Sequence, residues 1–258
     1  LHGWGIYTIG ALAVAYFGFR RRKKYLVSSC IPEVFANANL QTILRAFCDI
    51  SATLAVIFGM GASLGMGTEQ FAKGLNLVYE IPLNGVNLQI TVLAIVTVLF
   101  LVSATTGLNK GIKILSNLNI VVAILLMIFV FVVGPKLFVL KLFVDSIGKY
   151  INEIFVLSFQ TLPMVPSYEK WMGNWTINYF AWWIAWAPFV GIFLARISKG
   201  RTIRQLVLGS LIIPTVFSLM WFATFGGAAI HLDMNGFTQL ATQIKTDSAA
   251  ALFLLLQP

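Results

Sequence analysis

Three tryptophans lie within five positions of one apolar run, at Trp182, Trp183 and Trp186. The face of an indole ring attracts a cation electrostatically, by about 0.5–2 kcal/mol when water is excluded. A trimethylammonium group is charged but has no N–H, so hydrogen-bond acceptors gain little from it. Ring faces suit it better, and this run therefore predicts a binding site for a quaternary ammonium compound.

Two more aromatic residues, Trp4 and Tyr7, are three positions apart in the first apolar run and share a helix face. In the later run Trp182 and Trp186 share one face, while Trp183 projects about 100° around the helix. If both runs enter the membrane from outside, the two groups lie at similar depth, roughly one to two turns below the surface. An aromatic cage requires that match in depth. The alternative is an aromatic belt at the membrane interface, where Trp and Tyr normally gather.

The elements that position these rings are predicted to be membrane helices. The chain is 59% hydrophobic and 10% charged, whereas soluble domains carry about 25% charged residues. A membrane-spanning helix needs about 20 apolar residues. Six such segments are predicted, together forming one all-α, multi-pass transmembrane domain over residues 1–258: residues 4–19, 46–66, 88–106, 114–133, 178–194 and 205–230. The fourth could continue to residue 142, and residues 248–256 begin a further span or an interfacial helix.

The basic residues predict the orientation of these segments. Twelve of the 18 Lys and Arg residues fall in the stretches 20–45, 110–113 and 196–204. Each stretch joins two apolar segments, and the connections between them are nearly neutral. The positive-inside rule therefore places the three stretches in the cytoplasm and residue 1 outside, in a plasma (inner) membrane protein. This distribution argues against a nucleic-acid partner despite the net charge of +9.

The fourth connection is predicted to begin with an amphipathic helix on the outer surface, over about residues 145–162. Two prolines, Pro163 and Pro166, predict an irregular connection over residues 162–175. In the second segment, Gly61 and Gly65 form a G-x-x-x-G pair, which predicts a close helix approach. The alternative for this glycine-rich stretch is a locally unwound segment that lines an ion path.

No catalytic constellation is present in the sequence. His2 and His231 both fall near the outer membrane boundary, and Cys30 and Cys48 have no ligand partners nearby. Neither a metal site, nor a cofactor, nor an enzyme is predicted. Asp49 is expected to form an ion pair with Arg45, one helical turn away.

Four stretches of the sequence resemble the betaine/choline/carnitine transporters. They are WWIAWAPFVGIFLARISKGRTIR, HGWGIY, FGMGASLGMGTEQ and TGLNKGIKILSNLN. The resemblance covers essentially the whole chain but corresponds to the central half of a family member, so the chain is expected to be a fragment of a longer protein. It implies part of a twelve-helix, LeuT-like inverted-repeat fold, often trimeric, with the six segments similar to the family's fourth to ninth.

The resemblance also implies roles for individual residues. The family's aromatic box falls on Trp4, Tyr7 and Trp183, and Trp182 and Trp186 line the pathway on the same helix as Trp183. Phe189 matches a position associated with one sodium site in sodium-coupled members.

The expected function is sodium-coupled import of a quaternary ammonium osmolyte, with glycine betaine favoured. A proton-coupled choline importer of the same family is the alternative. From a different class, a non-transporting channel or structural membrane protein is the other candidate. The coupling ion, sodium or proton, is the only ion that the predicted function requires.

Overall fold

A computed structural model describes residues 1–256 apart from the segments 32–36, 80–84 and 106–112. Every regular element in those described ranges is a helix, which confirms the all-α fold class. The chain forms two compact units. The first comprises Leu1–Ala62 and Ile154–Ser218, and the second comprises Ser63–Glu153 and Leu219–Pro258. Each unit is described by itself.

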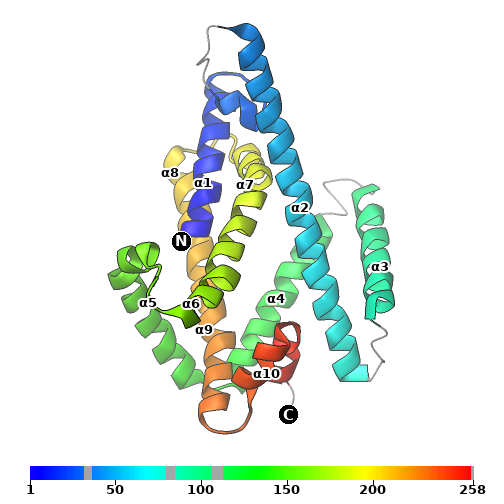
Figure 1. The fold of residues 1–258 in the computed structure, drawn as a ribbon, viewed down its shortest axis with the longest axis vertical. Helices are drawn as coiled ribbons and strands as arrows, with labels where there is room; N and C mark the ends of the chain where they lie inside the picture. The colour runs from blue at the N-terminus through cyan, green and yellow to red at the C-terminus, as the bar shows by residue number, and fades with distance from the viewer. Residues whose placement is uncertain (32–36, 80–84, 106–112, 257–258) are drawn as a thin grey trace. The chain divides into compact units, whose positions relative to one another are not determined.

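The first unit is built around α1, which lies between α7 and α8 (Figure 1). Helix α1 spans His2–Ala15 and continues as a π-helix, η1, over Tyr16–Arg20. A 3-10 turn, η2, follows at Val27–Cys30, and the long helix α2 begins at Ala38. The helices of the second half of this unit are α6 (Pro166–Trp171), the π-helix η4 (Met172–Ile177), α7 (Asn178–Ile197), α8 (Ile203–Val207), the π-helix η5 (Leu208–Ile212) and the start of α9 (Ile213–Met234).

Small residues bring the backbones of α1 and α7 into contact. A Cβ atom added to Gly191 would lie 3.2–3.4 Å from backbone atoms of Gly10 and Ala11. Ala11 and Ala195 are completely buried. On α7 these positions repeat every fourth residue, from Trp183 through Gly191 to Ala195, so a single face of the helix carries the whole contact. Such small-residue faces allow close packing of helices in membranes.

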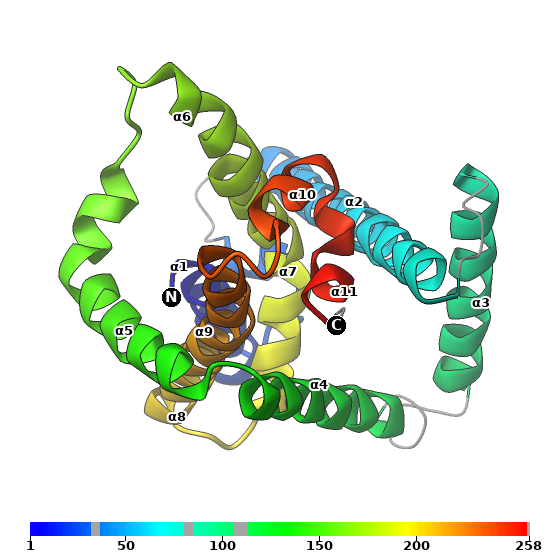
Figure 2. The same ribbon diagram turned by 90° about the horizontal axis from the view of Figure 1, so that it is seen from below.

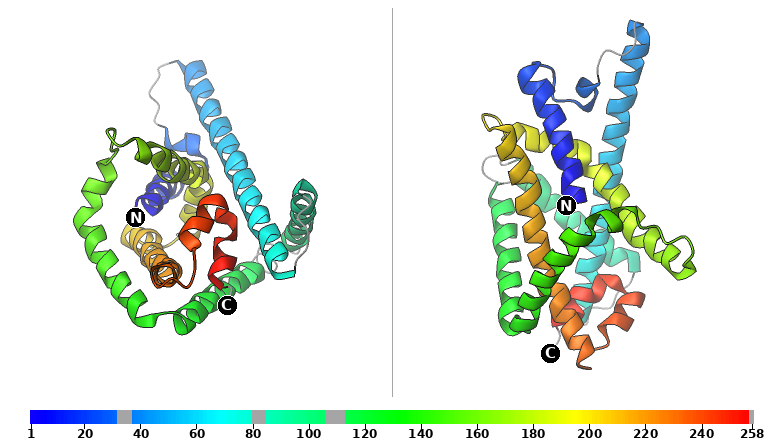
Figure 3. Two further views of the ribbon diagram at one scale, coloured as in Figure 1. Left: turned by 60° about the horizontal axis from the view of Figure 1, so that its bottom comes forward. Right: turned by 90° about the vertical axis from the view of Figure 1, so that its left-hand side faces the viewer.

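The second unit contains the end of α2 at Tyr79, α3 (Gly85–Thr105), α4 (Lys113–Val133), most of α5 (Lys136–Phe159) and most of α9. The chain bends between α4 and α5 (Figure 2). After α9 it folds back through α10 (Leu240–Thr246), the 3-10 turn η6 (Ser248–Ala250) and α11 (Ala251–Leu256) (Figure 3). A salt bridge of 2.6 Å joins Lys73 Nζ of α2 to Asp247 Oδ2, just after α10.

All six predicted apolar segments are helical where the structure describes them. Four described helices are long and apolar enough to cross a membrane, namely 38–79, 113–133, 166–197 and 203–234. The described part of the third segment is shorter, with its apolar core at Asn87–Ser103. The predicted cytoplasmic stretches include residues 32–36 and 110–112, and those residues lie outside the described part of the chain. The same holds for the first seven residues of the TGLNKGIKILSNLN motif.

Three predicted boundaries are wrong for local reasons. The fourth segment does not continue to residue 142, because the chain leaves the helix at Gly134 and Pro135, and α5 starts afresh at Lys136. The amphipathic helix therefore begins nine residues earlier than residue 145. Residues 166–175 are helical and not irregular, because Pro166 occupies the first turn of α6, where a missing N–H costs nothing.

The glycine-rich stretch of α2 is continuous helix, so the unwound alternative is wrong. Among the described residues, no atom lies within 4 Å of a Cβ added at Gly61 or Gly65. In this glycine-rich stretch, another helix comes close at Gly59, two residues before Gly61. A Cβ at Gly59 would lie 3.3 Å from the Ala185 Cβ and 3.4 Å from the Trp186 ring of α7.

Candidate functional site

The rings of Trp4, Tyr7 and Trp183 form one contiguous cluster between α1 and α7. The Trp4 ring centroid lies 5.9 Å from that of Tyr7 and 5.1 Å from that of Trp183. The Tyr7 and Trp183 centroids are 4.9 Å apart. Trp4 is nearly perpendicular to both other rings, at 79° and 80°, whereas Tyr7 and Trp183 are tilted by 33°. We call these three residues the aromatic cluster.

The centroid distances are short enough for one cation to lie within about 6 Å of all three rings, which is the range of a cation–π contact. The aromatic cluster joins residues that are 176 or more positions apart in the sequence. The first and the later apolar run therefore meet at these rings. That these rings bind a substrate stays a prediction.

A glycine on α1 makes room for the Trp183 indole. A Cβ added at Gly3 would lie 2.6–2.8 Å from three atoms of that ring, closer than non-bonded carbon atoms approach. The indole therefore lies directly on the backbone of α1. Sequence reasoning did not single out Gly3, although it stands next to Trp4 in the HGWGIY motif.

Hydroxyl groups join α1 to the helix formed by η5 and α9. The Trp4 indole Nε1–H donates to Ser218 Oγ at 3.4 Å. Thr8 Oγ1 and Ser210 Oγ are 2.8 Å apart, and both residues are buried, with 4% and 7% of their surface exposed. Sequence reasoning missed Thr8, Ser210 and Ser218. The available signal was that each is a hydroxyl residue within an apolar run.

The two remaining predicted tryptophans have ring neighbours of their own. Trp182 lies edge-on to Tyr179 with centroids 5.7 Å apart, and Trp186 lies edge-on to Phe189 at 5.9 Å. Trp186 also packs beside Gly59 of α2. Trp183 thus contacts α1 while Trp182 and Trp186 contact other rings, in agreement with the predicted offset of about 100° between Trp183 and the other two.

The aromatic ring implied to lie near sodium, Phe189, is 52% exposed. It lines a cavity of about 250 Å³ together with Pro188, Asp49 and Thr53. The Asp49 carboxylate accepts hydrogen bonds from the Ser28 N–H at 3.0 Å and the Ser28 hydroxyl at 2.6 Å. The expected ion pair between Asp49 and Arg45 is replaced by this contact with Ser28.

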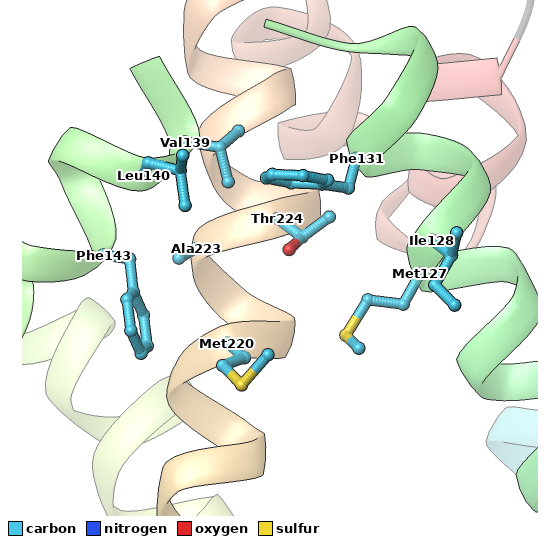
Figure 4. Close-up of a pocket in the computed structure, with 9 residues that line it drawn as sticks. All are labelled: Met127, Ile128, Phe131, Val139, Leu140, Phe143, Met220, Ala223 and Thr224. Atoms are coloured by element: carbon cyan, nitrogen blue, oxygen red, sulfur yellow. The ribbon is translucent and has the colours of Figure 1, made fainter. Parts of the chain in front are cut away.

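The second unit has a cavity of a different character. About 210 Å³ in volume, it lies between α4, α5 and α9 and is lined by side chains such as Phe131, Phe143 and Met220 (Figure 4). Among the described residues that line it, Thr224 contributes the only hydroxyl group and none carries a charged side chain. This cavity suits apolar groups and offers no counter-charge for a zwitterion.

The described residues contain no group of three or more His, Cys, Asp or Glu side chains that could hold a metal ion. Of the three rings of the aromatic cluster, that of Trp4 is held through its N–H by the Ser218 hydroxyl.

A model of the betaine/carnitine/choline family of transporters matches residues 1–258. The chain is 46% identical over 236 residues to the glycine betaine transporter OpuD of Bacillus subtilis, which covers 92% of this chain and 46% of that protein. It is 36% identical over 250 residues to an ectoine/hydroxyectoine transporter of Virgibacillus pantothenticus, covering 97% and 49%. It is 35% identical over 256 residues to the high-affinity choline transport protein of Escherichia coli, covering 99% and 37%. The chain thus spans about half the length of these relatives or less.

Proposed function

This chain belongs to the betaine/carnitine/choline family of transporters, and from that premise we propose that the full-length protein imports a quaternary ammonium osmolyte, with glycine betaine as the favoured substrate. The family consists of membrane transporters and not of enzymes. The observation that carries the proposal is the aromatic cluster of Trp4, Tyr7 and Trp183, whose three rings can share one cation.

The cluster favours a quaternary head group for a physical reason. Each ring face contributes about 0.5–2 kcal/mol to a desolvated cation. Three rings together supply about 1.5–6 kcal/mol, which corresponds to dissociation constants from about tens of millimolar down to tens of micromolar. Such affinity is weak enough to permit release on the other side of the membrane. Choline has the same head group and is the second candidate substrate.

We propose sodium as the coupling ion, with Phe189 near its binding site, and proton coupling as the alternative. The support is the match of Phe189 to a position associated with one sodium site in sodium-coupled members of the family, and the cavity that Phe189 shares with Asp49. In the same proposal residue 1 lies outside, the basic stretches lie in the cytoplasm and the assembly is a homotrimer. The mass of the detergent-solubilised protein tests the trimer.

The experiment that tests the function is uptake of labelled glycine betaine by the full-length protein, in cells that lack their own carriers. It is run in sodium and again in potassium, for the native protein and for Trp183→Leu, with choline as competitor. We expect sodium-dependent uptake that Trp183→Leu reduces roughly 2- to 30-fold at substrate concentrations below KM, because one ring face is lost. An uptake rate that is the same in sodium and in potassium but is abolished by a protonophore would support proton coupling. Absence of uptake of any quaternary amine by well-expressed protein would refute the proposal.

A further inference from the structure

A cavity of about 440 Å³ lies where the end of α1 meets the start of α8, within the first unit. This volume falls in the range of small-molecule binding sites, about 300–1,000 Å³. The cavity is separate from the aromatic cluster, which lies near the opposite end of α1. Its side chains are not used by the proposed transport mechanism.

The cavity is apolar along its length and basic at one end. Leu12 and Phe19 line it from α1 and η1, and Ile203 and Leu206 line it from α8. Two guanidinium groups line the same cavity, Arg20 at the end of η1 and Arg201 in the turn before α8. From Leu12 to Arg20 the helix advances about 12 Å. An apolar wall of that length with cationic side chains at one end is complementary to an amphiphile that has an apolar tail and an anionic head group.

The basic end has no acidic counterpart. No Asp or Glu side chain lines the cavity, and within the described ranges neither Arg20 nor Arg201 forms a salt bridge. The first turn of α8 is already capped. The Thr202 hydroxyl accepts from the Gln205 N–H, and the Gln205 side chain accepts from the Thr202 N–H. The donors left for an anion among the lining residues include the Tyr16 and Ser198 hydroxyls and the two guanidinium groups. Guanidinium groups match phosphate oxygens in geometry.

We propose that this cavity binds one anionic phospholipid, with its phosphate held by Arg20 and Arg201 and an acyl chain lying along Leu12, Phe19 and Leu206. The inference depends on the chain being a membrane protein and does not depend on which solute it transports. Both arginines belong to stretches that the charge distribution places on the cytoplasmic side, so the lipid belongs to the inner leaflet. Clusters of basic residues at that surface attract anionic lipids. In this cavity the apolar wall also provides a surface on which an acyl chain of the lipid can bind.

Native mass spectrometry of the full-length protein in detergent tests this site. The probes are phosphatidylglycerol, phosphatidylcholine, glycerophosphoglycerol (the head group without tails) and inorganic phosphate, each titrated separately. We expect phosphatidylglycerol to bind at least tenfold more tightly than the other three. We expect Arg20→Gln and Arg201→Gln each to weaken that binding roughly fivefold.

Lys199→Gln is the matched control, because it removes one positive charge from the same turn but Lys199 does not line the cavity. It should leave phosphatidylglycerol binding unchanged. Equal losses in all three variants would show a diffuse surface charge and overturn the site. Equal binding of the tail-free head group or of phosphate would overturn the lipid assignment in favour of a free anion. Should an arginine variant fail to fold, the comparison of the four probes on the native protein still decides the matter.

Discussion

Replacing Gly3 by alanine should weaken substrate binding, because the added methyl group displaces the Trp183 indole. The added Cβ would lie 2.6–2.8 Å from three atoms of the Trp183 indole, where carbon contacts normally begin at about 3.5 Å. The ring must therefore move by about 1 Å, away from the face that it shares with Trp4 and Tyr7. If the cation loses one ring, at about 0.5–2 kcal/mol, its dissociation constant rises roughly 2- to 30-fold.

The assay compares glycine betaine uptake by Gly3→Ala and Gly5→Ala in the full-length protein. Gly5 lies on the same helix, and no described atom lies within 4 Å of a Cβ added there. Both substitutions raise helix propensity equally, so a difference between them reports the indole alone. We expect KM to rise for Gly3→Ala with Vmax retained, and both parameters to stay unchanged for Gly5→Ala. Native kinetics in Gly3→Ala would refute the reasoning, as would the same change in both variants.

Two further outcomes follow from the contacts. Ser210→Ala should lower the free energy of unfolding by about 0.5–1.5 kcal/mol, because the buried contact with Thr8 is lost. In a thermal unfolding assay, Thr8→Val combined with Ser210→Ala should cost less than the two single changes added together. Burial raises the pKa of the Cys30 thiol, so less of it is thiolate at a given pH. In a Cys48→Ala background, its alkylation rate should keep rising at pH values where that of a free thiol has levelled off. A dependence of the alkylation rate on pH that matches free cysteine would contradict the raised pKa of the Cys30 thiol.

The helical membrane fold and the similar depth of the two aromatic groups were predicted from one-dimensional quantities, whereas the choice of Trp183 as the partner of Trp4 and Tyr7 came from the family resemblance. Apolar length gives the number of helices, and position along each helix gives the depth of a ring. Depth alone decides which residues of two inward-running helices can meet. Depth does not determine how each helix is rotated about its own axis. The sequence therefore predicted the depth of Trp182 and Trp186 on α7 but not which residues they contact.

The glycines show the limit of sequence reasoning most clearly. The G-x-x-x-G pair at Gly61 and Gly65 predicted close packing, yet the glycines of α2 that another helix approaches are Gly59, beside α7, and Gly74, beside Phe253 of α11. The tightest approach to the aromatic cluster is at Gly3, which belongs to no recognised spacing. A glycine shows only that a side chain is missing. Whether another helix uses that space depends on its position in three dimensions.

Hydroxyl residues in α1 and α9 illustrate a related point about the aromatic cluster. Thr8 and Ser218 each donate their proton to the carbonyl four residues earlier, Trp4 O and Pro214 O, both at 2.8 Å. The hydroxyl proton of such a residue is used in a hydrogen bond within its own helix, so the sequence gives no reason to expect a contact with another helix. With its proton used in this way, Ser218 Oγ offers only lone pairs to the neighbouring helix, and the indole N–H of Trp4 donates to one of them. An indole held at its N–H edge is fixed in place without using either ring face for that contact. A binding site for a cation that cannot donate hydrogen bonds depends on that condition, because the ring faces are the only groups that attract such a cation strongly.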